Sequence, residues 1–401
     1  ALLKKMKATS TSCCFEQWFE GEREWKEEEL TVALQRLDGE SRTVLDSTLL
    51  ELRRELGHLE SEAFLKARTA TNPYENLGNA GFVCRSALKL ANLEYVCQFC
   101  SGVERFADIC AAPGGFSEFL LWKNSKTQGF ALSLDGKNAD GPGIEMQFHH
   151  PRLISYAGDI YLSSDVNRFV SRTTTAKIDL VVADGGFHAC RDQPDQDIQL
   201  ARLALCETEI ALRILKYSGH FVLKLFLPLS SPPTLAIIAV AHACFRQIGL
   251  IKPITSRPAS GELYLIGLYC HAPLHARQEA AKTFRTYIDN PSLFSISNNH
   301  SPKTQDTTLF DIALDRARSY FLARQIKACR KILSYAHSFD DDDDDYALVD
   351  NSSFLSPSSI LALWNIRNND DKIEEVTLFS SLLCGERKKK RQRRSNGDTV
   401  L

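Results

Sequence analysis

The sequence has no excess of basic residues, since its 401 residues include 48 lysines and arginines against 50 aspartates and glutamates. The formal net charge of −2 excludes a general attraction to nucleic acid, so any site of that kind must be a local patch. The chain also lacks an apolar run of about 18 residues, and we therefore expect no membrane partner. Its 12 cysteines have no repeating spacing, which favours a reduced intracellular protein.

Metal-binding cysteine pairs are also lacking. Cys97 and Cys100 form a single CxxC with no matching second pair. A zinc or redox role needs more ligands or a thioredoxin-like setting, so we assign no metal. The hydrophobic content of 44% is enough to bury one domain of about 200 residues with flanking elements.

The chain changes its pattern twice. From Phe15 to about Leu65 it is rich in Glu, Leu, Arg and Lys at helical spacing. From about Asn72 to Cys270, short apolar runs alternate with helical stretches, which is typical of an α/β domain with a largely parallel sheet. We expect seven strands, at 106–110, 129–134, 152–158, 177–183, 219–226, 247–253 and 262–270. The last two are joined by only about eight residues, so the final strand should be antiparallel to its neighbours.

Beyond Cys270 the chain is again helical, most clearly over residues 309–333, with a short helix near 360–366. The acidic run 340–345 is typical of a solvated linker. The basic run 388–394 favours nuclear import; an RNA-contacting tail and a merely solubilising run are the alternatives. We therefore divide the chain into a helical N-terminal region contributing to substrate binding, a central domain, a helical C-terminal region with an acidic linker, and a basic tail (1–65, 66–272, 273–367 and 368–401).

A Gly-rich turn is the strongest single motif. In ADICAAPGGFSEFLLW a strand breaks at Pro113, turns through Gly114 and Gly115, and continues as a helix. Such a turn lets the backbone approach a bound cofactor closely. It is not a P-loop, because no Gly-Lys-Ser/Thr follows, and it lacks the G-x-G-x-x-G of dinucleotide enzymes. Alone, it would be read as an ordinary tight turn.

Two carboxylates strengthen the cofactor interpretation. Asp159 follows the third expected strand, and Asp135 follows the second. Ligands of doubly wound sheets bind beyond the carboxyl ends of the strands, where these side chains can accept hydrogen bonds from a ribose or an adenine amine. Either residue could instead be a simple turn residue.

Four more ionisable residues have unusual settings. Asp184 ends an apolar strand, Lys224 lies inside the apolar run GHFVLKLF, and Glu262 opens the last strand. If that strand is antiparallel, its beginning falls at the edge where the others end, so the three charges should converge. Lys89 lies on a helix before the first strand, and the sequence alone does not orient it. A lysine whose pKa is lowered by burial and a second cation could accept a proton from a ribose hydroxyl, with carboxylates orienting the lysines.

In this order, Lys89, Asp184, Lys224 and Glu262, with AAPGGFSE between the first two, resemble the K-D-K-E signature of FtsJ-type RNA 2′-O-methyltransferases. Eukaryotic cap 1 mRNA methyltransferases are the more similar branch, because KARTATNPYE (66–75) and KPITSRPAS (252–260) are not expected in general FtsJ enzymes of ribosomal RNA. The resemblance covers about residues 50–272, and weakly SILALWNIR near Trp364. Its other segments are RSALKLAN (85–92), ICAAPGGFSEFLLW (109–122), ADGGF (183–187) and GHFVLKLF (219–226).

The resemblance implies an α/β fold with a Rossmann-like class I methyltransferase sheet of seven strands, the last antiparallel, and helical N- and C-terminal extensions. It implies S-adenosyl-L-methionine as cofactor and the capped 5′ end of mRNA as partner, methylated on the first transcribed nucleotide, and it suggests the transcription machinery as a further partner. Lys89, Asp184, Lys224 and Glu262 inherit the catalytic roles, with Lys224 as proton acceptor. The cofactor contacts fall on Cys84, Cys110, Ala111, Ala112, Pro113, Gly114, Gly115, Phe116, Asp135, Asp159 and Ile160, and the substrate contacts on Arg53, Arg68, Arg257 and Ser260.

Some positions depart from the family. Cys84 and Ser260 each stand where the family carries Asn, and the Arg that follows NPYE in the family is absent. No catalytic group is lost. Larger members add a G-patch, a guanylyltransferase-like domain and a WW domain; none is recognisable here, so we expect a fragment or a short form. Two rival hypotheses are an FtsJ-type enzyme for another RNA or cap position and an inactive cap- or RNA-binding relative.

Overall fold

The computed structural model describes residues 14–19, 25–38, 47–134, 145–186, 196–290, 309–337, 356–364 and 366. Asp135, the acidic run 340–345 and the basic run 388–394 lie outside these residues. Within them, no helix combines the length and the apolar character needed to span a membrane.

One mixed sheet forms the centre of the molecule, in the order β1-β7-β8-β6-β5-β2-β3-β4. Five neighbouring strands, from β6 to β4, run parallel, whereas β8 is antiparallel to both β6 and β7. The predicted α/β sheet with an antiparallel last strand is therefore confirmed. Its strands are β1 (Cys14–Phe19), β2 (Arg105–Ile109), β3 (Gln128–Ser133), β4 (Leu153–Ala157), β5 (Ile178–Ala183), β6 (Leu215–Phe226), β7 (Phe245–Pro253) and β8 (Glu262–Cys270).

The first strand differs from expectation. All seven expected strands are present, but residues 14–19, which we expected to begin a helical region, form β1 instead. It pairs antiparallel with β7, with Cys14 opposite Pro253 and Phe19 opposite Ile248. The sequence CFEQWF contains three aromatic residues, a type enriched in strands.

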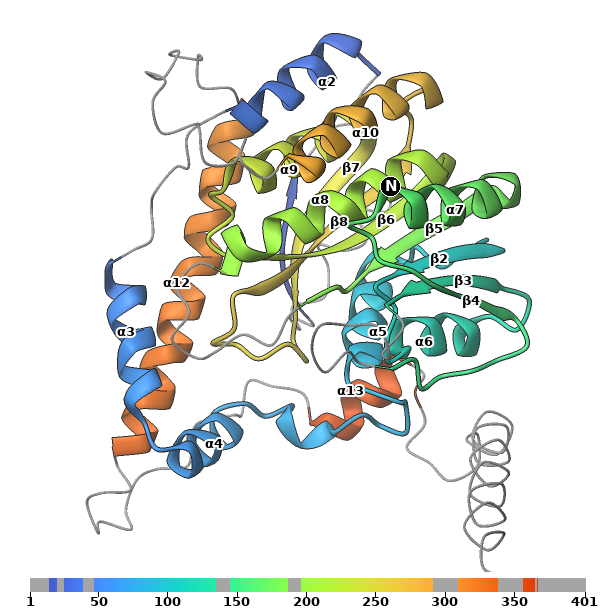
Figure 1. Cartoon of the computed structure of the whole chain (residues 1–401). Helices are drawn as coiled ribbons and strands as arrows, with labels where there is room; N and C mark the ends of the chain where they lie inside the picture. The colour runs from blue at the N-terminus through green and yellow to red at the C-terminus, as the bar shows by residue number, and fades with distance from the viewer. Residues whose placement is uncertain are drawn as a thin grey trace, which may run out of the picture.

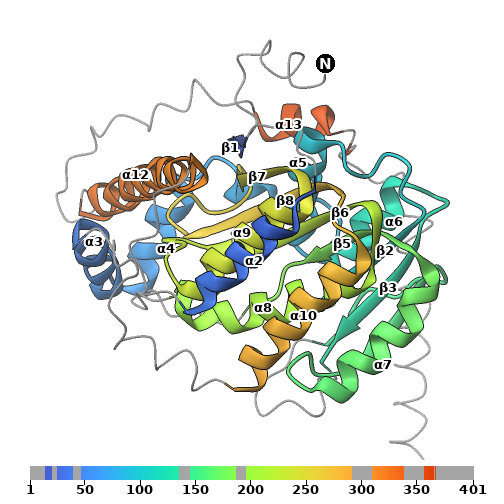
Figure 2. The same ribbon diagram turned by 90° about the horizontal axis from the view of Figure 1, so that it is seen from above.

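Helices cover both faces of the sheet, and each face has its own hydrophobic core. One layer contains α7 to α10 with α2, and the other contains α5, α6 and α13 (Figures 1 and 2). The long α12 packs against α3 and α4 at one side of the molecule. The helices are α2 (Glu27–Leu34), α3 (Ser47–His58), α4 (Ser61–Ala70), α5 (Ser86–Cys97), α6 (Gly115–Lys123), α7 (Ser163–Thr173), α8 (Gln196–Ile214), α9 (Pro232–Cys244), α10 (Leu274–Asp289), α12 (Leu309–His337) and α13 (Pro357–Leu363), with short 3₁₀ turns at Gln35–Asp38, Glu75–Leu77 and Thr174–Ala176.

Local sequence explains why these elements form. Every residue of β5 is buried, as expected for a central parallel strand with a helix layer on each face, and its sequence IDLVVA is almost entirely apolar. The helix α9 starts with two prolines after Ser231, whose hydroxyl accepts the N–H of Thr234. At the other extreme, β4 is an edge strand and is largely exposed. The middle of the sheet is thus more buried than this edge, and its strands β5 and β6 end at the candidate site.

Candidate active site

Four charged side chains meet at the sheet edge where the parallel strands end. Asp184 directly follows β5, and Lys224 lies two residues before the end of β6. Because β8 runs antiparallel to β6, its first residue, Glu262, stands opposite Phe226 at the same edge. Lys89 comes from α5, whose orientation the sequence did not reveal. The structure therefore brings together all four residues singled out in the sequence.

These side chains form two ion pairs. Nζ of Lys89 lies 2.7 Å from Oε2 of Glu262, and Nζ of Lys224 lies 3.0 Å from Oδ1 of Asp184. Lys224 also donates to the backbone oxygen of Asp184 at 2.7 Å. The hydroxyl of Tyr264, which is fully buried, donates to Oδ1 of Asp184 at 2.7 Å. Each carboxylate is thus oriented by more than one donor, which keeps the lysine beside it in one position.

Burial and charge act in opposite directions at Glu262. Burial raises the pKa of this carboxyl, but the positive charges of Lys89 and Lys224 outweigh burial and lower it to about 2. Burial likewise lowers the pKa of Lys89, and the attraction of Glu262 and Asp184 more than reverses that effect, so its pKa is raised. Both members of this pair are therefore charged at neutral pH.

The loop before β8 holds Glu262 in place. Ser256 Oγ donates to Oε1 of Glu262 at 2.8 Å, and the Glu262 N–H donates to Oγ of Ser260 at 3.2 Å. Beneath the loop, the buried Nζ of Lys252 donates to the backbone oxygens of Ser260 and Glu262 at 2.7 and 2.8 Å. Burial lowers the pKa of Lys252 to about 8, while the charge of Glu262 acts in the opposite direction. Ser260, a predicted substrate residue, is thus part of the support for a predicted catalytic residue.

Another buried carboxyl group lies next to the Asp184–Lys224 pair. Oε1 of Glu207, from α8, accepts the N–H of Gly185 at 2.9 Å. Burial raises the pKa of Glu207 to about 8, although the charge of Lys224 acts to lower it. A Cβ at Gly185 would collide with that oxygen, and a Cβ at Gly186 would lie 2.9 Å from Nζ of Lys224. A side chain at Gly185 would therefore displace the Glu207 carboxyl group, and one at Gly186 would displace the Lys224 amino group.

The Gly-rich turn lies at the end of β2. Cys110 has a φ of 59° and Gly114 a φ of 115°, both in the left-handed region, and the Ala112–Pro113 peptide is cis. The helix α6 begins at Gly115, where a Cβ would collide with Cys84 and Ser86. This contact places Cys84 against the turn. The predicted cofactor residues Cys110, Ala111, Ala112, Pro113, Gly114, Gly115 and Phe116 thus form one continuous backbone turn beside it.

Two buried carboxyl groups, those of Asp108 and Glu118, make hydrogen bonds next to this turn. Asp108 accepts a hydrogen bond from Oγ of Ser117 at 2.7 Å, and Glu118 accepts the N–H of Val83 at 2.6 Å. Burial raises the pKa of each carboxyl to about 7. The contact from Glu118 ties α6 to the segment that carries Cys84.

Asp159 and Ile160 lie in the loop that follows β4. Oδ1 of Asp159 accepts the N–H of Tyr161 at 2.8 Å, and the N–H of Asp159 donates to Oδ2 of Asp165 at 2.9 Å. The Asp159 side chain is half-buried and Ile160 is buried. Since the turn after β2 and this loop both lie at the carboxyl edge, with only β3 between the two strands, they face the same ligand-binding side of the sheet.

A cluster of arginines surrounds Glu75, in the short 3₁₀ turn after α4. Oε1 of Glu75 lies 3.3 Å from Arg68, 2.7 Å from Arg85 and 3.2 Å from Arg257. Burial raises the pKa of Glu75, but Arg85 and Arg257 outweigh it and lower the pKa. Two of the predicted substrate residues, Arg68 and Arg257, are therefore neighbours although they are far apart in the chain.

Arg53 lies on α3 and is buried, with only 6% of its surface exposed. Its Nη2 is 3.4 Å from the position that a Cβ on Gly261 would occupy, so its guanidinium lies against the loop that contains Ser260. This burial shows that Arg53 packs under the loop rather than on the open surface.

Sequence reasoning missed several residues of the site. Lys252 carried the same signal as Lys224, a lysine in an apolar strand, and could have been found on that ground. Glu207 begins a short polar segment, ETE, between apolar residues of α8, which was a weaker signal. Tyr264 and Glu75 had no signal, because their roles depend on partners from distant segments. Cys97 and Cys100 are both buried and neither is in a disulfide, and no group of His, Cys, Asp or Glu in the described part of the chain could hold a metal ion.

Comparison with known proteins agrees with this architecture. Residues 82–270 match the FtsJ-like methyltransferase family. The cap-specific mRNA (nucleoside-2′-O-)-methyltransferase 1 of Xenopus laevis is 27% identical over 329 residues, which are 73% of this chain and 38% of that protein. The Mus musculus protein of the same name is 33% identical over 238 residues, covering 52% of this chain and 28% of that protein. The Drosophila melanogaster protein of that name is 32% identical over 260 residues, covering 58% and 33%. The resemblance predicted from the motifs is confirmed, and the chain spans well under half the length of these relatives.

Proposed function

We propose, from the premise that residues 82–270 form an FtsJ-like methyltransferase domain, that this protein methylates the ribose 2′-hydroxyl of the first transcribed nucleotide of capped mRNA, using S-adenosyl-L-methionine. One observation carries the chemistry. The pairs Lys89–Glu262 and Lys224–Asp184, with Nζ-to-carboxylate distances of 2.7 and 3.0 Å, converge from α5 and three strands at the sheet edge where ligands of this fold class bind.

Lys224 is the residue best placed to act on the hydroxyl. Its Nζ is held by the carboxylate and the backbone oxygen of Asp184, which occupy two of the three directions in which a lysine nitrogen makes hydrogen bonds. The third direction is left for the ribose oxygen. When bound, S-adenosyl-L-methionine would supply the methyl group, whose bond to sulfur breaks as the 2′-oxygen takes it up. Lys224 would enter this step as the neutral amine: the lone pair of its Nζ accepts the proton of the hydroxyl, and the resulting ammonium group stays paired with Asp184.

The neighbouring charges help this step. Lys89 adds a second cation beside the developing negative charge on the ribose oxygen, and Glu262 keeps that cation in position. Asp184, oriented by Tyr264, fixes Lys224 so that little reorganisation is needed during the reaction.

The turn after β2 suits the proposed cofactor. S-adenosyl-L-methionine supplies a methyl group bound to a positively charged sulfur. The first N–H groups of α6 have no acceptor within the helix, and the left-handed backbone at Gly114 brings the chain close to the ligand side of the sheet. Asp159 offers a half-buried carboxylate two strands away, suited to ribose or adenine groups. Cys110 to Phe116 would hold one part of the molecule, and Asp159 and Ile160 another.

The arginines around Glu75 suit the capped 5′ end. A cap and its first nucleotides carry several phosphates, for which arginine is the favoured partner. Arg257 has a 48% exposed side chain and is held near Arg68 by the shared carboxylate. The named relatives are cap-specific mRNA methyltransferases, which favours capped mRNA over other RNAs as the substrate.

The experiment uses m7G-capped RNA with labelled methyl donor, followed by mapping of the methylated nucleotide. Wild-type protein is expected to modify the first nucleotide, and Lys224→Met to reduce the rate by at least about a hundredfold while capped RNA still binds. The matched control is Lys216→Met, because Lys216 lies on the same strand and pairs with Asp179 at its other end.

Each rival hypothesis has its own outcome. Equal activity on uncapped RNA, or a methyl group on the second nucleotide, would replace the cap 1 assignment with another FtsJ-type substrate. Binding of capped RNA without any methyl transfer would indicate an inactive relative. Wild-type rates in the Lys224→Met variant would overturn the proposed mechanism.

A further inference from the structure

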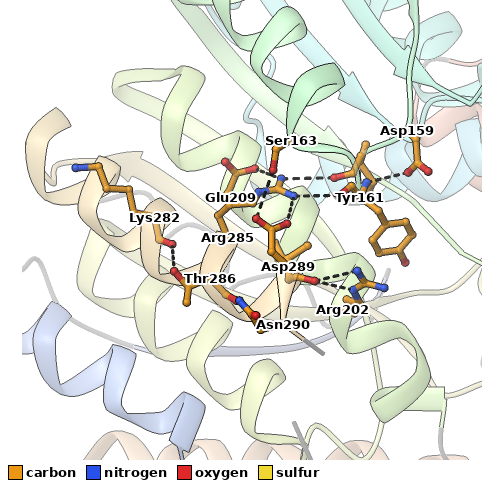
Figure 3. Close-up of polar contacts among 12 residues, drawn as sticks. Asp159, Tyr161, Ser163, Arg202, Glu209, Lys282, Arg285, Thr286, Asp289 and Asn290 are labelled. Carbon is orange, nitrogen blue, oxygen red and sulfur yellow. Dashed lines mark hydrogen bonds and ion pairs between the residues drawn. The ribbon is translucent and has the colours of Figure 1, made fainter. Parts of the chain in front are cut away.

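The loop after β4, residues 158–162, has an exposed position in the fold. The strand β4 is at the edge of the sheet, so the loop has strand neighbours on one side only. Within the loop, Asp159 accepts the N–H of Tyr161, and Leu162 donates to the backbone oxygen of Asp159 at 3.1 Å. The start of the loop is attached to β3 and α7, because the N–H of Gly158 donates to the backbone oxygen of Ser133 and that of Asp159 to Oδ2 of Asp165, each at 2.9 Å. The next residues, Ile160 and Tyr161, are held from α8 and α10 (Figure 3).

Arg285 of α10 reaches the loop directly. Its Nη1 donates to the backbone oxygen of Tyr161 at 3.4 Å, and its Nη2 to that of Ile160 at 3.5 Å. Each bond is long, but the donor is charged and the two act together on consecutive carbonyl groups. Figure 3 shows Arg285 lying between Glu209 and the loop that carries Asp159 and Tyr161.

A buried carboxylate holds the arginine in this position. Oε2 of Glu209 lies 2.8 Å from Nη2 of Arg285, and the Glu209 side chain is only 1% exposed. Its other oxygen accepts Nη1 of Arg213 at 2.7 Å. Burial lowers the pKa of Arg285, and the charge of Glu209 reverses this and raises it, so the guanidinium stays charged. The geometry of Arg285 is therefore fixed from the side opposite the loop.

A second arginine closes the contact from α8. The guanidinium of Arg202 lies 4.6 Å from the ring centroid of Tyr161, and Nε and Nη2 donate to the backbone oxygen of Ile288 at 3.1 and 2.9 Å. Arg202 thus joins the loop side chain to the last turn of α10. The backbone of the loop is held by Arg285 and its aromatic ring by Arg202.

We propose that Arg285 is a positioning residue for cofactor binding: through Ile160 and Tyr161 it holds the loop so that Asp159 is presented in its binding geometry. The inference rests on the proposed function, because it takes the loop to be part of the cofactor site. The inference goes beyond the proposed function because it gives a role to α10. The helix α10 lies outside residues 82–270, so an element outside the matched family region sets the affinity of the site for the adenosine part of its ligand.

The physical reason is preorganisation. A loop that is already in its binding conformation loses less conformational freedom when the ligand arrives, and the affinity is higher by that difference. Arg285→Lys keeps the positive charge against Glu209 but replaces a two-pronged donor by a single ammonium group, which cannot span both carbonyl groups and the carboxylate. We expect the dissociation constant for the cofactor product to rise about tenfold.

The experiment compares Arg285→Lys with wild type and with a matched control, Lys282→Met. Lys282 lies three residues earlier on α10, is 72% exposed and pairs with Glu279 at 2.6 Å. Figure 3 shows its side chain pointing away from the loop. Calorimetry measures the binding of S-adenosylhomocysteine, a separate titration measures capped RNA, and hydrogen exchange follows the amides of Asp159, Tyr161 and Leu162.

The expected result is weaker S-adenosylhomocysteine binding and faster exchange in the loop for Arg285→Lys, with capped RNA binding unchanged and Lys282→Met like wild type. Cofactor binding within twofold of wild type, or unchanged exchange in residues 158–162, would overturn the proposal. If wild type binds no S-adenosylhomocysteine, the proposed cofactor is wrong, whereas the exchange comparison still decides whether Arg285 holds the loop. If Arg285→Lys does not fold, Glu209→Gln is used instead, because it removes the charge that holds Arg285. This variant should also bind S-adenosylhomocysteine more weakly while its binding of capped RNA is unchanged. Unchanged binding of S-adenosylhomocysteine in Glu209→Gln would count against the proposal.

Discussion

At the scale of single residues, Glu118 makes the stability of the Gly-rich turn after β2 depend on pH. Burial raises its pKa from the ordinary 4.5 to about 7, and its carboxylate accepts the N–H of Val83. A folded-state pKa above the unfolded value means that the folded protein binds the proton more tightly. The stability from this group is therefore fully present below about pH 4.5 and is lost as the pH rises through about 7.

Glu118→Gln should remove this pH dependence, because the amide oxygen can still accept the Val83 N–H and never becomes charged. At pH 5 the free energies of unfolding of wild type and variant should be similar. At pH 9 the variant should be more stable by about 3 kcal/mol, from a shift of roughly 2.5 pKa units. Denaturant titration at both values measures the difference. Glu62→Gln, at an exposed site on α4, should bring no such gain, and a variant that loses stability between pH 5 and 9 as much as wild type does would contradict the assignment.

The residue scale also shows where sequence reasoning stops. Lys224 could be found because a lysine between apolar residues of a strand is unusual, and Asp184 because it follows such a strand. Lys89 lies on a helix with apolar residues on several sides, so only packing shows that it points toward Glu262. Glu75 looks like an ordinary polar loop residue, and its meaning depends on three arginines from separate segments.

At the scale of elements, α12 supports the loop that precedes β8. Nε2 of Gln325 donates to the backbone oxygen of Ala259 at 2.9 Å, next to Ser260. Nε of Arg318, about two turns earlier on the same face of the helix, donates to the backbone oxygen of Pro228 at 3.0 Å. The helix is thus attached to two loops at the site edge, although it lies outside residues 82–270.

Gln325→Met should loosen this loop without unfolding the protein. The methionine keeps the volume and removes a buried amide oxygen that has no partner, which offsets part of the lost bond to Ala259. We expect KM for capped RNA to rise roughly two- to fivefold with kcat little changed. Steady-state kinetics and a melting curve measure both effects. Ala323→Ser, on the exposed side of α12, is the control; equal KM values in Gln325→Met and wild type would refute a role for this contact.

Element prediction succeeded where the pattern was local. The seven expected strands are each recognisable by a short apolar run, and the short link before β8 is enough to indicate its direction. The strand β1 was missed because the six residues CFEQWF show no strand alternation and stand before a Glu-rich stretch at helical spacing. Its strand conformation comes from pairing with the free edge of β7, which no local pattern can predict.

At the scale of the whole molecule, a net charge of −2 means that the proposed RNA binding would rely on a few local contacts. The arginines around Glu75 form such a patch, and Arg257 is the most exposed of the three. Binding by a patch of this kind is sensitive to salt, because each phosphate contact releases counterions.

Arg257→Gln should reduce the slope of log affinity for capped RNA against log salt by about 0.7, the value for one phosphate contact on a single strand. Titrations at several salt concentrations measure the slope. Arg246→Gln is the matched control, because Arg246 is exposed at the start of β7 and lies near Tyr217 instead. Equal slopes for Arg257→Gln and wild type would show that Arg257 does not meet the RNA backbone.

The strand β8 carries a final consequence for how this chain can change. Glu262 and Tyr264 are two residues apart, face the same side of the sheet, and reach Lys89 and Asp184 respectively. Residues added to the loop at 254–261 leave that spacing intact, whereas a single residue added at 263 would turn one of the two side chains to the opposite face. Homologous chains should therefore vary in the length of this loop but keep a single residue between the glutamate and the tyrosine. The candidate site therefore depends on the number of residues between Glu262 and Tyr264 as well as on which residues they are.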